Sequence, residues 1–184
     1  MTPGPKPYRH EFTENELRRY QIAHSISPHS ILGSIGENVV VNKFLEHNIP
    51  VYTHFGFDQY VDLIAEFNGG LQRIQVKTSA QITSNGSIRF SLNAISPTTK
   101  NGYRVTKSIP YTKNEIDYFA LYDFICDKVY LIEVPDPPMI SIRLCEINNS
   151  SGLSSARYLR KDFEFDTVIK SFSAIDAEYK IMED

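Results

Sequence analysis

The dipeptide Asn68-Gly69 restricts the fold of this chain more than any other feature of its sequence. It divides the segment VDLIAEFNGGLQRIQVKTS, residues 61–79, into two runs with alternating apolar residues. Asn-Gly is the preferred pair of a type I′ turn, because both central residues of that turn need a positive φ. We therefore predict two antiparallel strands joined by a two-residue loop, with Phe67 opposite Gly70.

Three polar side chains interrupt these apolar strands: Asp62, Gln75 and Lys77. Alternate residues of a strand face opposite sides, so all three are expected on one face of the hairpin. The two-residue loop opposes Asp62 to Gln75, whereas a turn at Gly69-Gly70 would oppose Asp62 to Lys77. Only a three-residue loop or a bulge would separate these side chains.

This set of side chains is suited to the hydrolysis of a phosphodiester. Carboxylate and carboxamide oxygens hold Mg²⁺, the metal polarises the phosphoryl group and activates water, and an ammonium steadies the attacking oxygen. The alternative is a structural ion pair between Asp62 and Lys77 on a half-exposed sheet, which contributes at most about 1 kcal/mol.

A helix is expected before the hairpin, from Ser30 or Ser34 to His47, and it carries a further carboxylate, Glu37. At 100° per residue, Glu37 falls in the apolar sector of this helix, together with Val40, Val41 and Phe44. A helix that begins at Ser34 would use Glu37 in a capping box. A helix that begins earlier would leave Glu37 available to a metal.

The order of these residues carries a family resemblance. Glu37, Asp62 and Gln75-Val76-Lys77, placed in a helix, a strand and the strand after a hairpin, resemble the PD-(D/E)XK nuclease superfamily. The glutamine and the later segment YTKNEIDYFALYDFICDKVYLIEV are similar to a branch of homing endonucleases encoded by group I introns of cyanobacteria, and to their bacterial relatives. The resemblance covers about Gly33 to Pro135.

The resemblance implies an α/β fold with a restriction-endonuclease-like core, in which α-helices flank a mixed central β-sheet. It also implies Mg²⁺-dependent cleavage of double-stranded DNA, with Mn²⁺ as a substitute, by a homodimer or higher homo-oligomer. By position, Asp62 is the principal metal ligand, with the Gln75 side-chain oxygen and the Val76 carbonyl beside it. Glu37 assists the metal and Lys77 serves the nucleophile. The implied catalytic set is Glu37, Asp62, Gln75 and Lys77.

Two positions depart from the family pattern. Gln75 is neutral where most of the superfamily has a second acidic group, so a lower metal affinity is expected and a two-metal arrangement is less well supported. Val61 stands where the family name has proline, a position that carries no chemistry.

The charges of the chain are unevenly distributed. From Phe67 to Asn114 there is no Asp or Glu and the charge is +7, so the rest of the chain carries −10 and the net charge is −3. A basic segment in an acidic protein favours binding of a polyanion such as DNA. Phosphate contacts are expected mainly from a long basic loop through Pro97 and Pro110; the alternative is a solvated surface loop. The expected DNA-binding residues are Arg89, Lys100, Arg104, Lys107 and Lys113, with a weaker cluster at Arg157, Arg160 and Lys161.

A chain of 184 residues with 41% apolar content has the size of one domain. We predict a flexible N-terminal arm over residues 1–12 and a single nuclease-like domain over 13–184, with its core at 30–135 and a C-terminal extension at 136–184. The two cysteines have no metal-ligand spacing, which disfavours zinc. No apolar run is long enough for a membrane span or a signal peptide, so a cytoplasmic protein is expected.

Local patterns predict the remaining elements. Thr13 and Glu16 form a capping-box signature for a helix that ends near His24. Strands are expected at 51–54, 88–92, 116–124 and 128–134, the last two paired across a polar turn. The C-terminal part indicates a strand at 139–147, a loop at 150–155 and helix within 165–182.

The sequence thus predicts a metal-dependent endodeoxyribonuclease of the homing or restriction-like type. A junction-resolving or repair nuclease on the same fold is the alternative enzyme. A DNA-binding module with a weak or inactive site, which the neutral Gln75 favours, and a structural or protein-binding domain are the alternatives from other classes. Nucleotide hydrolysis is disfavoured because GSIGE, residues 33–37, lacks the Lys-Ser/Thr of a phosphate-binding loop.

Overall fold

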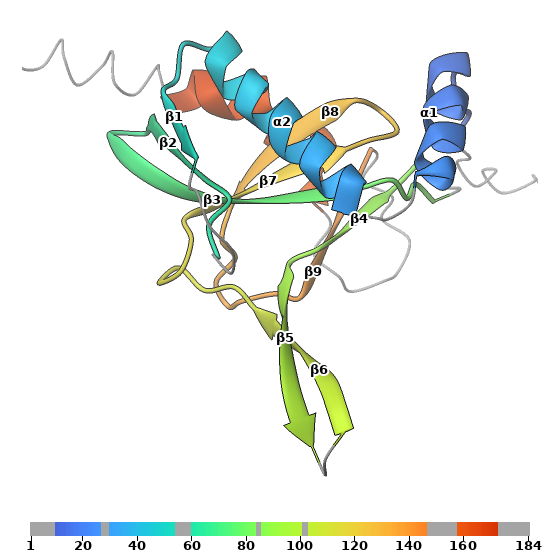
Figure 1. Cartoon of the computed structure of the whole chain (residues 1–184). Helices are drawn as coiled ribbons and strands as arrows, with labels where there is room; N and C mark the ends of the chain where they lie inside the picture. Colours follow the sequence, from blue (N-terminus) through green and yellow to red (C-terminus); the bar gives the residue numbers. More distant parts are fainter. Residues whose placement is uncertain are drawn as a thin grey trace, which may run out of the picture.

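A sheet flanked by helices carries a two-stranded hairpin that projects away from it (Figure 1). The computed structural model describes residues 10–26, 30–53, 60–83, 86–100, 103–146 and 158–172, with the backbone alone at 96–100 and 103–105. The described helices are α1 (Glu14–Ser25), α2 (Ser30–Glu46) and α3 (Arg160–Phe163), and residues 165–172 are also helical. The described strands are β1 (Val51–Thr53), β2 (Leu63–Phe67), β3 (Gly70–Ser79), β4 (Ile88–Ser91), β5 (Asn93–Lys100), β6 (Tyr103–Pro110), β7 (Tyr118–Asp123), β8 (Lys128–Glu133), β9 (Ser141–Cys145) and β10 (Tyr158–Leu159).

A five-stranded mixed sheet with the order β1-β2-β3-β7-β8 forms the centre of the fold. β3 and β7 are parallel, and the other neighbours in this sheet are antiparallel. Parallel neighbours need a crossover connection, and here it contains β4, β5 and β6 (Figure 1). The other described sheets are β10-β9-β4 and the hairpin β5-β6. The predicted α/β architecture, a mixed central β-sheet flanked by α-helices, is confirmed.

The turn between β2 and β3 has the predicted type and register. Asn68-Gly69 adopts φ angles of 50° and 75°, as the central pair of a type I′ turn requires. Phe67 consequently pairs with Gly70, and Leu63 pairs with Ile74. A slip of one residue would exchange the two faces of the strand, so the turn decides which face carries the polar side chains.

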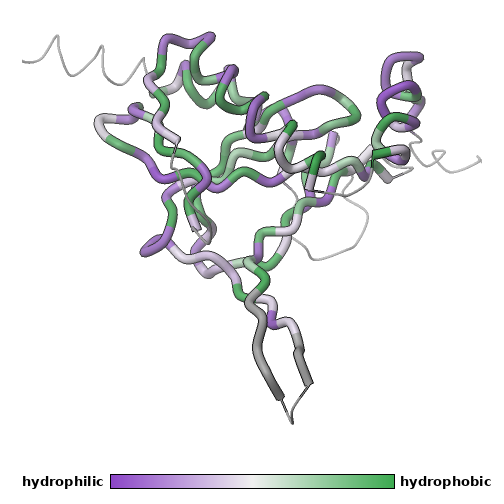
Figure 2. The backbone as a smooth tube through the Cα atoms, in the orientation of Figure 1, coloured by the Kyte–Doolittle hydropathy of each residue, from purple (hydrophilic) through white to green (hydrophobic). Residues whose placement is uncertain are grey.

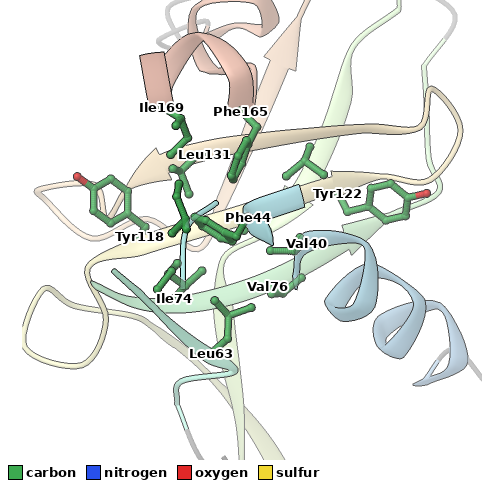
Figure 3. Packing of buried hydrophobic residues seen from close by; sticks show 14 of the residues in the cluster. Val40, Phe44, Leu63, Ile74, Val76, Tyr118, Tyr122, Leu131, Phe165 and Ile169 are labelled. Carbon is green, nitrogen blue, oxygen red and sulfur yellow. The ribbon is translucent and has the colours of Figure 1, made fainter. Parts of the chain in front are cut away.

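Both faces of the central sheet are buried. On one face, α2 and the helical residues 165–172 cover a core in which Phe44 and Phe165 lie with their ring centroids 4.7 Å apart (Figure 3). The other face packs against β4 and β9, and its buried residues include Ile88, Phe90, Phe119, Leu121, Tyr130 and Ile142. Figure 2 accordingly shows hydrophobic residues concentrated along the central strands.

Helix α2 contacts the sheet through a stripe spaced by four residues, formed by Leu32, Gly36, Val40 and Phe44. Gly36 permits the closest approach, because a Cβ at this position would overlap Oγ1 of Thr78 on β3. Burial of a side chain such as Phe44 stabilises the fold by about 1.5–3 kcal/mol. The helix begins at Ser30, the earlier of the two predicted starts, so Glu37 lies in its second turn and does not cap its N-terminus.

The predicted basic loop through Pro97 and Pro110 is wrong as a description of the backbone. Residues 93–110 form the antiparallel hairpin β5-β6, in which Pro97 pairs with Thr106 and Pro110 with Asn93. Both strands of a two-stranded ribbon are edge strands, where proline is tolerated because its missing N–H need not reach a neighbour. The two prolines therefore do not mark a loop here.

Most of the other predicted elements lie close to their predicted bounds. The capping box of α1 forms, with the Thr13 hydroxyl and the Glu16 carboxylate bonded to each other's backbone N–H groups. β7 and β8 pair as predicted. The predicted loop at 150–155 and the end of the predicted C-terminal helix lie outside the described residues.

The two ends of the described chain pack against the core. Residues 1–9 of the predicted arm lie outside the described residues, but Phe12 packs against the core cluster that includes Val40 and Phe44. Phe165 and Ile169, in the predicted extension, belong to the same core. The division into an arm and one domain stays a prediction. No helix in the part of the chain that the structure describes is long and apolar enough to cross a membrane.

Candidate active site at the fork of the central sheet

β3 changes partners along its length, which opens a fork in the sheet. Its residues 70–74 pair with β2, whereas residues 74–79 pair with β7 on the other side. Among the described strands, none pairs with the free side of β3 at residues 75–79. In a strand, the N–H and C=O of one residue point to the same side. The N–H of Val76 points into the fork, and its carbonyl therefore does so as well.

Asp62 lies at this fork, one residue before β2. Its N–H donates to the carbonyl of Ile74 over 2.9 Å, which extends the ladder by one bond. Its carboxylate oxygen Oδ2 accepts a hydrogen bond of 2.7 Å from the N–H of Val76 and another from the side-chain amide of Gln75. Asp62 and Gln75 are therefore in contact, as the predicted register requires.

Gln75 is buried beside Asp62, with 6% of its surface exposed. Its amide nitrogen Nε2 donates to Asp62 Oδ2 and lies 3.4 Å from the carbonyl oxygen of Val76. Its carbonyl oxygen Oε1 is buried and accepts no hydrogen bond from the residues that the structure describes. A buried acceptor without a partner destabilises the fold by about 1–3 kcal/mol. Such an unsatisfied group is often found where the residue has a functional role.

The donors at the fork fit a hard divalent cation. A carboxylate, a carboxamide oxygen and a peptide carbonyl are oxygen ligands of the kind that Mg²⁺ accepts together with water. Within the described ranges, no three His, Cys, Asp or Glu side chains are grouped to hold a metal. A cation at this fork would thus depend on Asp62, the amide of Gln75, the carbonyl of Val76 and water.

Lys77 follows two residues later on the same face of β3. Its ammonium nitrogen lies 5.0 Å from the centroid of the Tyr111 ring. Burial lowers the pKa of Lys77 below its ordinary value, and the charge of Asp62 acts in the opposite direction. A partly desolvated amine near a carboxylate is a common arrangement at a reaction centre.

Two tyrosines form a wall beside Lys77. Tyr111 is buried, and burial, with a contribution from Asp62, raises its pKa to about 12. Tyr60 packs edge-on against Tyr111 with ring centroids 5.9 Å apart. In the sequence, Tyr111 only borders the predicted basic loop through Pro97 and Pro110, and Tyr60 was not singled out. Tyr111 follows Lys77 by 34 positions, so no local sequence pattern predicts that its ring packs against the Lys77 ammonium.

Glu37 does not occupy the apolar sector in which the sequence placed it. The buried stripe runs through Gly36 and Val40, and Glu37, one position round the helix, is exposed. The contact of Gly36 with Thr78 brings this turn of α2 against β3. Helix α2 covers the sheet face that carries Val76, the face opposite to Gln75 and Lys77. A role of Glu37 at the metal stays a prediction.

The predicted DNA-binding residues are spread over the crossover between β3 and β7. Arg89, Lys107 and Lys113 are exposed, on β4, on β6 and in the turn before β7. Lys100 and Arg104 lie near the tip of the hairpin β5-β6, and their side chains lie outside the described residues. The projecting hairpin thus carries part of the basic segment away from the sheet (Figure 1).

The structure adds a basic residue that the sequence did not single out. Arg143 on β9 is paired directly with Arg89 on β4, and both side chains are exposed. Like charges directly opposite on two strands are destabilising unless an anion lies between them. The sequence signal was weak, because the two arginines are 54 positions apart.

Two arginines have structural roles instead. The Arg73 side chain donates two hydrogen bonds to the Asp117 carboxylate, at 2.8 and 3.0 Å, and the Arg73 backbone N–H donates a third. The guanidinium also donates to backbone carbonyls before β7. Arg160, from the weaker predicted cluster, is only 7% exposed and donates to the carbonyl of Gly86, so it is not a DNA contact. Arg157 lies outside the described residues.

A surface pocket of about 500 Å³ lies away from the fork, between α2, the turn after β7 and the residues near Asp166. Its charged groups form ion pairs, including Lys43 with Asp166 at 3.0 Å. None of its lining residues matches the buried Gln75 oxygen at the fork, which has no hydrogen-bond partner among the described residues.

Comparison with solved structures defines the class of the fold. The chain is similar to a bacterial homing endonuclease, I-Ssp6803I, with a TM-score of 0.57 and 17% sequence identity, over 80% of this chain and 97% of that chain. At this identity the likeness establishes the fold alone. The mixed sheet with its forked central strand defines a restriction-endonuclease-like protein.

The sequence gives the family. The family model described as PD-(D/E)XK endonuclease matches residues 29–166. The chain therefore belongs to the PD-(D/E)XK endonuclease family, a family of nucleases, and the predicted resemblance is confirmed. A search of curated proteins found no match.

Proposed function

We propose that this protein is a metal-dependent endodeoxyribonuclease of the homing or restriction-like type. One observation carries the proposal: the buried amide of Gln75 contacts the Asp62 carboxylate through its nitrogen, and its oxygen has no hydrogen-bond partner among the described residues, with Lys77 on the same face of the strand. Family membership supports the nuclease activity. Metal dependence, DNA as the substrate and the residue roles belong to the proposal.

Each residue at the fork has a distinct task. Asp62 is the principal ligand, and the Gln75 oxygen and Val76 carbonyl complete the protein's share of the coordination. When bound, Mg²⁺ or Mn²⁺ supplies Lewis-acid polarisation of the phosphoryl group and a lowered pKa of water. Lys77, held over Tyr111, orients the attacking water and balances the charge that develops on phosphate. Glu37 would assist from α2, directly or through water.

The basic surface binds the DNA backbone. Arg89, Lys107 and Lys113 are exposed along the crossover, and Arg143 joins Arg89 as a second arginine at one phosphate. Lys100 and Arg104 extend the contact along the hairpin. Such contacts position the duplex without reading its sequence.

Concerted cleavage of both strands requires two sites, and the cluster described here supplies one per chain. We therefore propose a homodimer or a higher homo-oligomer, a closed symmetric assembly being the usual solution. Light scattering of the protein with and without duplex DNA measures the number of subunits. A protein that cleaves both strands of a duplex but stays monomeric when bound to it would contradict the proposed oligomer.

Plasmid nicking tests the function. We expect the native protein to cut supercoiled DNA with Mg²⁺ or Mn²⁺ and not with EDTA. Lys77→Ala should lower the rate at least about 100-fold while DNA affinity stays nearly unchanged, because Lys77 acts on the reacting groups. Lys170→Ala, an exposed lysine at the end of the described chain, is the matched control. Equal rates for native protein and Lys77→Ala would contradict the assignment.

The neutral Gln75 supports one second candidate, a DNA-binding module with a weak or inactive site. Binding without cleavage at any Mg²⁺ or Mn²⁺ concentration would favour this module. Preferential cleavage of four-way junctions over linear duplexes would favour a junction-resolving or repair nuclease.

A further inference from the structure

Gln75 contacts, through a single nitrogen, two of the oxygens expected to surround a metal. Its Nε2 donates to Asp62 Oδ2 and lies 3.4 Å from the carbonyl oxygen of Val76. The other end of the amide, Oε1, is buried without a hydrogen-bond partner among the described residues. The N–H group of Gln75 thus occupies a position beside these oxygens that a cation could take. The oxygen Oε1, which could be a metal ligand, faces away from them.

Rotation of the last side-chain bond of Gln75 exchanges these two atoms. That torsion is broad and nearly two-fold, so both orientations fit the same space. In the turned orientation, Oε1 would meet Asp62 Oδ2 and the Val76 carbonyl, and three oxygens would converge. This is unfavourable without a cation and favourable around one.

We propose that the carboxamide of Gln75 is a metal-coupled latch, a proposal that rests on the proposed function of the site. Without a metal, the nitrogen end of the amide donates a hydrogen bond to Asp62. With a metal, the amide turns and its oxygen becomes a ligand. A ligand shifts a two-state group only through its different affinity for the two states, and here only the turned state offers the third oxygen.

The latch gives a physical reason for an amide at this position. A carboxylate at position 75 would present oxygen in both orientations and would repel Asp62 whenever the metal is absent. The amide removes that repulsion, and breaking its hydrogen bond to Asp62 reduces the metal affinity. The site thus remains ordered without its metal, at the expense of weaker binding.

The variant Gln75→Glu tests both consequences of the amide: the absence of repulsion without a metal and the weaker binding of the metal. We expect its metal-free melting temperature to lie about 5 °C or more below that of the native protein, since the buried carboxylates repel. Its Mg²⁺ affinity, measured by calorimetry, should be at least about tenfold higher, because no hydrogen bond is broken and a charge is added. Saturating Mg²⁺ should therefore raise its melting temperature more than that of the native protein.

Gln81→Glu is the matched control. Gln81 is exposed beyond the end of β3, so this change adds the same charge without contact to Asp62. We expect its metal-free melting temperature and Mg²⁺ affinity to equal those of the native protein. Equal melting temperatures and affinities for native protein and Gln75→Glu would overturn the latch.

The native protein provides a second measurement that does not depend on folding of a variant. The side-chain NH₂ protons of Gln75, followed by NMR, should be protected from solvent exchange in EDTA and at least about tenfold less protected at saturating Mg²⁺. Unchanged protection at a concentration that shifts the backbone amide of Val76 would overturn the latch and leave the metal site standing. No Mg²⁺-dependent shift at Val76 would contradict the metal-dependent function itself, and the latch with it.

Discussion

The ammonium nitrogen of Lys77 lies 5.0 Å from the centre of the Tyr111 ring, and the same tyrosine is packed edge-on by Tyr60. The ring attracts the cation through its negative face, and such contacts contribute about 0.5–2 kcal/mol. Because β3 fixes the backbone of Lys77 and Tyr111 fixes the end of its side chain, the amine has a defined position at the fork.

Loss of this ring should impair catalysis without impairing DNA binding. We expect Tyr111→Leu to lower kcat about tenfold or more, since small displacements of a reacting group cost up to about 100-fold. Tyr111→Phe keeps the ring and should retain most of the activity. Separate measurement of kcat and KM for plasmid nicking checks this. Tyr52→Leu, at an exposed tyrosine of β1, serves as the control; a KM effect alone for Tyr111→Leu would contradict the positioning role.

Asp117 should make stability depend on pH. Its hydrogen bonds with Arg73 hold the pKa of Asp117 below its ordinary value, although burial acts the other way. A depressed pKa in the folded state means that this contribution is complete above the unfolded pKa of about 3.9 and is lost as the pH falls through the folded value.

The variant Asp117→Asn measures that contribution. Both partners are partly exposed, so solvent screening reduces it to about 1 kcal/mol, or roughly 2–4 °C in melting temperature at pH 7. The difference from the native protein should vanish at the acid end of a pH series of thermal melts. Asp162→Asn, at an exposed aspartate of α3, is the control. A difference that grows toward low pH would contradict the sign.

Gly36 and Gly33 should respond in opposite directions to alanine. A Cβ at Gly36 would overlap Thr78 Oγ1, whereas a Cβ at Gly33 meets nothing within 4 Å. We expect Gly36→Ala to destabilise by about 1–3 kcal/mol and Gly33→Ala to stabilise by up to about 1 kcal/mol. Denaturant unfolding of both variants checks this pair. Thr78→Ala in the Gly36→Ala background should restore part of the loss, and full additivity of the two changes would exclude the clash.

Arg143→Ala should weaken DNA binding without destabilising the protein. Removal of one phosphate contact lowers affinity several-fold and reduces the slope of log K against log salt by about one. The melting temperature should stay equal or rise, because Arg89 then loses a like charge opposite to it. Binding titrations at several salt concentrations measure the slope. Arg18→Ala, on the exposed side of α1, is the control, and an unchanged slope for Arg143→Ala would remove Arg143 from the DNA surface.

The sequence predicted the parts of the fold that depend on neighbouring residues. The turn at Asn68-Gly69 determined the register of β2 and β3, and with it the contact between Asp62 and Gln75. The capping box at Thr13 determined the start of α1. In each case the chemistry of two to four adjacent residues decides the backbone conformation.

The sequence did not predict features that arise from packing between distant segments. Pro97 and Pro110 indicated a loop, but an edge ribbon has no need of their missing N–H groups. Glu37 was assigned to the apolar side of α2, but its side chain is exposed, while Gly36 beside it makes the close contact with Thr78. Tyr111 and Arg143 are far in sequence from Lys77 and Arg89, and folding alone brings each pair together.

The parallel pairing of β3 with β7 has a consequence for how such a nuclease changes its target. Residues 80–117 must cross from one strand to the other, and the hairpin β5-β6 is inserted in that crossover, outside the five-stranded sheet. A shorter, longer or exchanged hairpin would therefore leave the strand register, and with it the cleavage chemistry, in place. Under the proposed function, DNA binding by the hairpin and catalysis at the fork are separate parts of this chain, and transplanted hairpins should alter which DNA is bound while circular dichroism and the melting temperature of the core remain those of the parent.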